Sequence, residues 1–100
     1  MGTLKVVWRK KAILRFDQIV NWYANELGSG AASKCVHCIN DTVNTLSHSP
    51  EIGILDEEFS TRKIKYYSFL FHPKYRLVYH FNKTTLYISA IRATMMKRGS

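Results

Sequence analysis

Three runs of strand-forming residues, separated by two turn sequences, follow one another in the last third of the chain. The runs cover residues 63–71, 75–81 and 85–91, and each is rich in Tyr, Phe, Val, Leu or Ile. Such side chains pack well on a pleated surface. The links at residues 72–74 and 82–84 contain Pro or Asn, which are typical of turns. This pattern predicts a three-stranded antiparallel meander.

The first half of the chain changes from a strand period to a helix period. Leu4, Val6 and Trp8 occur at alternate positions and predict a short strand with one buried face. Gly28-Ser-Gly30 then separates two stretches with helical spacing, so we expect an antiparallel helical hairpin, which Pro50 ends. The apolar stripes of these helices are Ile13, Phe16, Val20, Tyr23 and Leu27 in the first, and Ala32, Val36, Ile39, Val43 and Leu46 in the second.

The predicted fold is α+β with two layers, in the order β-α-α-β-β-β. Each helix has an apolar stripe to bury, and the meander has one apolar face to cover it. A chain of 100 residues has room for one modest core, so we expect a single domain over residues 1–100. An acidic loop, residues 51–60, joins the helices to the meander, and residues 92–98 form a basic tail long enough for one further helical turn.

Positive charge is concentrated at the two ends of the chain. The formal net charge is +8 and the pI is about 9.7. From Phe59 to Ser100 there are nine Lys or Arg residues and no Asp or Glu, whereas four of the seven acids lie in the acidic loop. A sheet with only positive formal charge suits an anionic partner, either nucleic acid or an acidic protein segment.

Several classes of protein are not indicated. No apolar run approaches the roughly 20 residues that span a bilayer, and Lys5 and Arg9 interrupt the first apolar stretch, so we expect a cytoplasmic protein without membrane contact. Cys35-Val-His-Cys38 lacks the second ligand pair of a structural zinc site, and we expect Cys35 to be a core residue. No phosphate loop or nucleophile elbow is present, and we expect no cofactor and no metal.

The order of elements and three sequence motifs resemble a known family. The motifs are Ser-Pro-Glu-Ile-Gly at residues 49–53, Lys-Tyr-Arg-Leu-Val-Tyr at residues 74–79 and Leu-Tyr-Ile-Ser-Ala-Ile at residues 86–91. From Leu4 to Lys97 the chain resembles the RelE/ParE superfamily of bacterial toxins. This resemblance implies a RelE/ParE-like fold and the toxin of a type II toxin–antitoxin system, which serves plasmid stabilisation. It also implies a cognate antitoxin whose acidic amphipathic segment neutralises the toxin.

The resemblance covers two effector activities. RelE-like members cut messenger RNA in the ribosome, and ParE-like members inhibit DNA gyrase and are not known to use a nuclease site. In this chain Phe71 stands where the ribonucleases carry an Arg, and Met95 stands where a basic residue is common. RNA cleavage through the 2′-hydroxyl needs a base, an acid and cationic groups, and the usual set is incomplete. The ParE-like class is therefore favoured, while a ribosome-dependent endoribonuclease and a non-toxic nucleic-acid-binding module stay open as alternatives.

Candidate site residues follow from the charge pattern and the resemblance. For target binding we expect Arg76, Arg92, Lys97 and Arg98, with Lys63 and Lys65 as secondary contacts. A ribonuclease would use Arg76 as a phosphate clamp, His72 as acid or base, and Lys65 as a further cation. For antitoxin binding, in a groove between the hairpin and the apolar side of the sheet, we expect Ile13, Phe16, Tyr23, Tyr79 and Tyr87.

Overall fold

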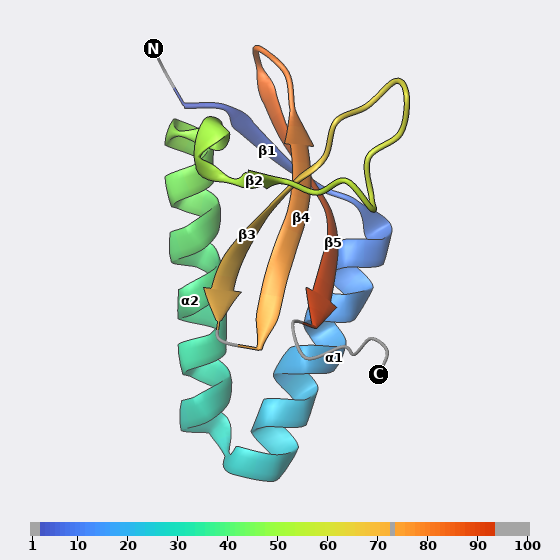
Figure 1. Ribbon diagram of the computed structural model, residues 1–100. Coiled ribbons are helices and arrows are strands. Elements are labelled where there is room, and N and C mark those ends of the chain that lie inside the picture. Colours follow the sequence, from blue (N-terminus) through green and yellow to red (C-terminus); the bar gives the residue numbers. More distant parts are fainter. Residues whose placement is uncertain (1–2, 73, 94–100) are drawn as a thin grey trace.

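Two helices lie against one face of a curved sheet (Figure 1). The computed structural model describes residues 3–72 and 74–93, except for the side chain of His72. The elements are β1 (Lys5–Trp8), α1 (Lys10–Leu27), α2 (Ser29–His48), the 3-10 turn η1 (Pro50–Ile52), β2 (Ile54–Leu55), β3 (Tyr67–His72), β4 (Tyr75–Phe81) and β5 (Thr85–Ala93). The described helices include none that is both long and apolar enough to cross a bilayer.

The five strands form one mixed sheet in the order β1-β5-β4-β3-β2. Strands β3, β4 and β5 are consecutive antiparallel neighbours, which confirms the predicted meander. Strand β1 pairs in parallel with β5, from Lys5 opposite Thr85 to Trp8 opposite Ile88. Strand β2 pairs with β3 inside the expected acidic loop, where the sequence did not predict a strand. The predicted α+β class is thus confirmed, with two more strands in the sheet than the meander alone.

A single glycine joins the two helices. Helix α1 ends at Leu27 and α2 begins at Ser29, so Gly28 alone reverses the chain. Gly28 has a φ of +97°, a conformation that residues with a Cβ rarely adopt. Its N–H donates to the Ala24 carbonyl at 3.2 Å, and its carbonyl accepts from the Ala32 N–H at 3.2 Å. The predicted hairpin is confirmed, with a shorter link than the sequence suggested.

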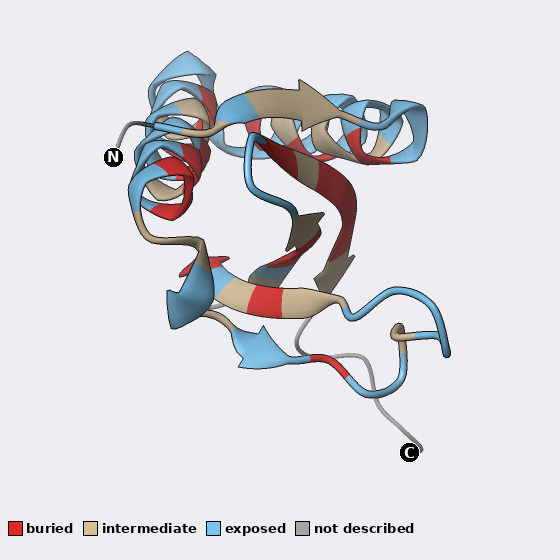
Figure 2. Cartoon of the chain, turned by 90° about the horizontal axis from the view of Figure 1, so that it is seen from above, coloured by how far each residue is buried: buried red, intermediate tan, exposed pale blue. Residues whose placement is uncertain are grey.

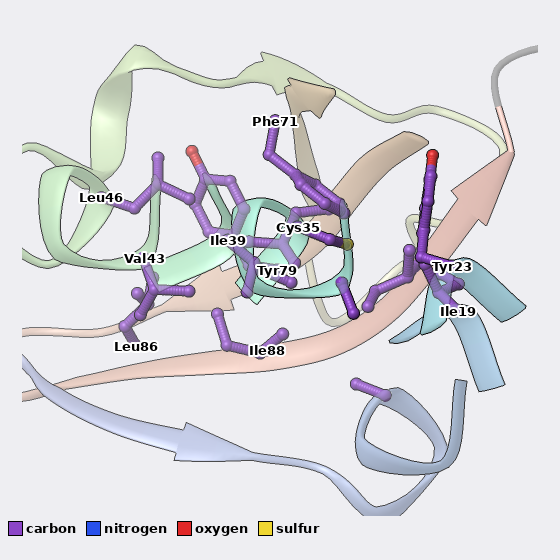
Figure 3. Close-up of a cluster of buried hydrophobic side chains, with 14 residues drawn as sticks. Ile19, Tyr23, Cys35, Ile39, Val43, Leu46, Phe71, Tyr79, Leu86 and Ile88 are labelled. Carbon is purple, nitrogen blue, oxygen red and sulfur yellow. The ribbon is translucent and has the colours of Figure 1, made fainter. Parts of the chain in front are cut away.

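The core lies between the helices and the sheet. Figure 2 shows that buried residues of both helices face the strands, while the outer helix surfaces are exposed. Side chains from α1, α2 and three strands converge there (Figure 3), and replacing such a Leu or Ile by Ala costs about 2–5 kcal/mol. The cluster consists of Ala12, Ile19, Tyr23, Ala32, Cys35, Ile39, Val43, Leu46, Phe71, Leu77, Tyr79, Leu86, Ile88 and Ile91. Cys35 is therefore the core residue that the sequence predicted.

A bulge in β5 decides which face Arg92 occupies. Val78 pairs with Ala90 and the next residue, Tyr79, pairs with Ile88, so one extra residue enters β5 between them. The bulge allows Ile88 and Ile91, three positions apart, to reach the same core. Arg92 then lies opposite Arg76. Strict alternation from Ile88 would instead turn position 92 towards the helices.

Two predicted boundaries are wrong. Strand β3 begins at Tyr67, so Lys63 and Lys65 lie in a loop rather than in a strand. Strand β5 continues to Ala93, so Arg92 belongs to the sheet rather than to a basic tail. Both differences arise because the partner strand, and not local propensity, sets where pairing starts and stops. Residues 94–98 of the expected tail lie outside the described residues.

Candidate functional site

The face of the sheet opposite the helices carries the polar residues of the meander. Leu77 and Tyr79 of β4 point into the core. Because side chains alternate along a strand, Arg76, Val78 and His80 point to the face away from the helices. The strand register brings residues of β3 and β5 alongside them. We call this surface the helix-free face, and it comprises Ser68, Arg76, Val78, His80, Tyr87 and Arg92.

A loop folds back onto the helix-free face. This central loop, residues 56–66, is closed at its base by the Asp56 N–H, which donates to the Tyr66 carbonyl at 2.8 Å. The Ser60 hydroxyl donates to the Asp56 carbonyl at 2.7 Å and accepts from the Tyr66 N–H at 2.8 Å. These bonds hold the base of the central loop, from which Asp56 reaches Arg92 on β5 and Tyr66 reaches His80 on β4.

Arg92 is bound by two carboxylates of the central loop. Its Nη1 donates to the two oxygens of Asp56 at 3.3 and 3.1 Å, and its Nη2 donates to Glu58 Oε1 at 2.6 Å. The hydrogen bond to Glu58, followed by the charge of Asp56, raises the pKa of the Arg92 guanidinium. The Asp56 side chain is only 8% exposed, whereas that of Glu58 is 80% exposed and screened by water.

The cationic surface expected for the meander is therefore neutralised at Arg92 by carboxylates of the central loop. The sequence places the acids in a separate loop, but the fold brings two of them onto β5. A role for Arg92 in target binding would require an anionic group of the target to displace these carboxylates. Arg76, opposite it, instead donates to the Ser68 hydroxyl at 3.4 Å, and no ion pair of Arg76 is found among the described residues.

A row of rings crosses the helix-free face. The Arg9 guanidinium lies 5.1 Å from the ring centre of Tyr87, which stacks on His80 at 4.7 Å. Tyr66 meets the His80 ring edge-on at 4.9 Å. Burial, followed by the positive charge of Arg9, lowers the pKa of His80 below its ordinary value of 6.5. His80 is thus neutral at neutral pH, and its ring acts as a stacking element rather than as a cation.

Lys63 and Lys65 line a cavity of about 330 Å³ beside the end of β4. The remaining described lining comes from Ile64, Tyr67, His80 and Phe81, so this part of the wall has two ammonium groups and no carboxylate. We call this cavity the lysine pocket. Ammonium groups bind phosphate and carboxylate oxygens by charge-assisted hydrogen bonds, so the pocket can hold either anionic group.

Of the residues expected for a ribonuclease, the structure describes the side chains of Arg76 and Lys65, and these two lie far apart. Lys65 lies at the lysine pocket, which His80 of β4 also lines. Arg76 precedes His80 by four residues on β4, a separation of about 13 Å along the strand. Phe71 is buried in the core and its ring lies 6.1 Å from that of Tyr75. The side chain of His72 and all atoms of Met95, Lys97 and Arg98 lie outside the described part of the chain.

The residues expected to bind an antitoxin do not form one surface. Ile13 is exposed on α1, and Phe16 is half-buried against Trp8. Tyr23 is buried at the hairpin, whereas Tyr87 lies on the helix-free face.

Tyr79, which the sequence analysis expected to contact an antitoxin, is instead a core residue. Its side chain is 0% exposed and packs against the helices (Figure 3). Its hydroxyl donates to the Pro50 carbonyl at 2.6 Å, and burial raises the pKa of the phenol to about 12. Tyr79 therefore holds the turn after α2 in place. The sequence alone does not show whether a tyrosine within a strand points into the core or to the surface.

The sequence analysis did not predict the contacts of the acidic loop or the cavity beside α1. The sequence analysis described the acidic loop that contains Asp56 and Glu58 only as a connection, although the separation of acids from the basic meander was a signal for pairing between the two segments. Arg15 and Trp22 were not singled out, because helical periodicity marks the buried stripe and not the residues beside it. They line a second cavity, together with Lys74, at the other end of β4.

One family model matches nearly the whole chain. Residues 6–98 match the family model described as the ParE toxin of type II toxin–antitoxin systems, parDE. A chain of the chromosomal ParDE system from P. aeruginosa is 19% identical, with a TM-score of 0.68 over 91% of this chain and 96% of that one. The comparison with curated proteins finds no match.

Two further solved structures are similar in fold. The YoeB/ParE toxin from Agrobacterium tumefaciens is 18% identical, with a TM-score of 0.61 over 90% of this chain and 98% of that one. The YoeB dimer from Staphylococcus aureus is 18% identical, with a TM-score of 0.62 over 91% and 97% of the two chains. At these identities the structures share the fold with this chain, which confirms the RelE/ParE-like architecture.

Proposed function

Since this chain belongs to the ParE toxin family of type II toxin–antitoxin systems, we propose that it arrests growth by binding DNA gyrase. In this proposal it acts in the cytoplasm, serves plasmid stabilisation, and is held inactive by a cognate antitoxin. The chromosomal ParDE system from P. aeruginosa, whose toxin fold is similar, supports the expectation of an antitoxin partner.

The observation that carries this proposal is the separation of the candidate catalytic residues. Arg76 and Lys65 lie at different ends of β4, and His80 beside Lys65 is held in a stack with its pKa lowered. Position 71, where the ribonucleases carry an Arg, points into the core. General acid–base catalysis needs its groups within hydrogen-bond reach of the same substrate atoms. Binding without cleavage is the activity that this arrangement supports best.

The proposed target contacts are Arg76 on the helix-free face and the lysine pocket. Arg76 is exposed and carries no carboxylate partner among the described residues. Lys63 and Lys65 add positive charge at the far end of β4. Lys97 and Arg98 complete the proposed set, and Arg92 joins it only when the central loop releases its guanidinium.

A second candidate function rests on the lysine pocket. Two ammonium groups beside an imidazole can hold a scissile phosphate, so a ribosome-dependent endoribonuclease is the alternative. A third reading, a nucleic-acid-binding module without toxicity, rests on the net charge of +8.

One set of assays with the purified protein separates these functions. Under the proposal, the chain inhibits supercoiling by purified gyrase and traps cleaved DNA, and it leaves messenger RNA intact in a translating extract. Codon-phased cuts with unaffected gyrase would assign the ribonuclease function instead. Salt-dependent oligonucleotide binding without either effect would assign the third. Co-expression with the product of the adjoining reading frame is expected to restore growth, and failure to do so removes the antitoxin from the proposal.

A further inference from the structure

A second cavity, of about 370 Å³, lies between α1 and the turn that leads into β4. Arg15, Ile19, Trp22 and Tyr23 enter it from α1, because spacings of three, four and seven place them on one helix face. Lys74 and Tyr75 form the opposite wall. We call this cavity the Arg15–Lys74 pocket. It lies at the other end of β4 from the lysine pocket, and of the target contacts that the structure describes, Arg76, Lys63 and Lys65 are not among its lining residues.

The Arg15–Lys74 pocket combines a cationic rim with an apolar floor. Arg15 donates from Nη1 to Gln18 Oε1 at 3.3 Å, which orients its guanidinium at the rim. Among the described residues, the lining contributes two cations, Arg15 and Lys74. Ile19 and Tyr23 are buried beneath them, and burial, as the largest cause, raises the pKa of the Tyr23 phenol, so its hydroxyl stays protonated. An anionic group that enters therefore meets charge-assisted donors in a partly desolvated site.

Two exposed apolar side chains of α1 lie beside the pocket. Trp22 is 50% exposed although its ring contacts Tyr23 edge-on, with centroids 5.2 Å apart. Leu14 is 57% exposed and lies in the same helical row as Gln18 and Trp22, at spacings of four. An exposed aliphatic side chain next to an exposed indole suits a polypeptide with apolar side chains. A nucleic-acid backbone would use the two cations but not Leu14.

We propose that the Arg15–Lys74 pocket receives a Glu or Asp side chain of the antitoxin, whose neighbouring apolar side chains cover Trp22 and Leu14. This inference rests on the proposed function, since it assumes an antitoxin with an acidic amphipathic segment. It assigns antitoxin recognition to a site that is separate from the target contacts on β4. The cations of the pocket, together with the exposed Leu14 and Trp22 beside it, favour an acidic amphipathic segment over either a purely acidic or a purely apolar one.

The test compares two double variants with the same loss of charge. Arg15→Gln with Lys74→Gln removes the cations of the pocket, and Lys5→Gln with Lys83→Gln removes two exposed cations at the other end of the sheet. The probe is the purified product of the reading frame that adjoins the gene for this chain. We expect the pocket variant to bind it about 10-fold or more weakly than the control variant at the same salt concentration. The pocket variant should still arrest growth, and the antitoxin should no longer rescue it.

Trp22 provides an independent readout of occupancy. The chain has two tryptophans, so Trp8→Phe leaves Trp22 as the sole indole emitter. Antitoxin binding should shift this emission to shorter wavelength, because the partner excludes water from the ring. The shift should disappear in the pocket variant at antitoxin concentrations that saturate the control.

The outcomes of these experiments distinguish failure of the pocket assignment from failure of the proposed function. Equal affinity of the pocket and control variants, with normal arrest and rescue, would overturn the pocket assignment and leave the proposed function intact. A wild-type chain that neither arrests growth nor binds the adjoining product would overturn both. Loss of single-stranded oligonucleotide binding in the pocket variant, with antitoxin affinity unchanged, would assign the pocket to nucleic acid and overturn the proposal.

Discussion

Arg92 on β5 and Asp56 at the start of the central loop are joined by two hydrogen bonds of 3.1 and 3.3 Å, although 36 positions separate them. This contact ties the acidic loop to the face of the sheet that the helices leave open. It also neutralises a cation that the sequence alone would assign to an anionic target. The contact therefore bears on both stability and function.

Replacing Arg92 by Gln should destabilise the fold by about 1–3 kcal/mol, because the nearly buried Asp56 carboxylate loses its cationic partner. Urea unfolding followed by circular dichroism measures this change. Glu58→Gln is the control, and it should change stability by less than about 0.5 kcal/mol because that carboxylate is screened by water. Equal effects of the two substitutions would contradict a buried anchor at Asp56.

Gly53→Ala should destabilise the protein by about 1–3 kcal/mol, since an added Cβ would collide with the Tyr79 hydroxyl. Gly30 provides the matched control, because a Cβ there meets open space on α2. Gly30→Ala should stabilise the helix by about 0.5–1 kcal/mol. Thermal unfolding of both variants tests the prediction, and a neutral Gly53→Ala would show that Tyr79 does not need its contact with the turn.

Tyr79 should make stability fall at alkaline pH. Burial raises its pKa from 10.0 in the unfolded chain to about 12 in the fold, so the folded state holds the phenolic proton more tightly. Its contribution is complete below pH 10 and is lost as the pH rises through about 12. Tyr79→Phe should be less stable at neutral pH by about 1 kcal/mol and should lose less stability on going to alkaline pH. Parallel unfolding curves for the two proteins across that range would refute the assignment.

His80 should make the stability of the fold decrease at acidic pH. Its pKa is lowered from 6.5, so the stability that its neutral ring contributes is present above 6.5 and is lost as the pH falls through the folded-state value. His80→Phe keeps a flat ring between Tyr66 and Tyr87 and cannot take up a proton. We expect the wild-type protein to lose more thermal stability than this variant between about pH 7 and pH 5. An NMR titration midpoint for His80 at or above 6.5 would contradict this prediction.

Arg76→Ala should abolish growth arrest while the fold stays intact, because Arg76 is exposed and its single described contact is to Ser68. Loss of one charge-assisted contact weakens target binding by about 10- to 100-fold. Arg62→Ala, which removes an exposed cation of the central loop, is the control and should retain arrest. Unchanged arrest with Arg76→Ala would remove this residue from the target contacts.

The amino-acid sequence by itself determined the α+β class, the helical hairpin, the meander and the burial of Cys35. These features depend on the spacing of apolar residues and on local turn chemistry, both of which can be read along a chain. Its motifs also pointed to the toxin family that the comparisons then identified.

Only the tertiary structure determined which face of the sheet each polar or aromatic side chain occupies and which residues it contacts. The bulge at Ser89 sets the face of Arg92, and the closure of the central loop gives it Asp56 as partner. Tyr79 and Tyr87 look alike in the sequence, yet one fills the core and the other stacks on the helix-free face. Such outcomes depend on register and on contacts between segments far apart in the chain, and a one-residue shift in register reverses the face of every side chain that follows.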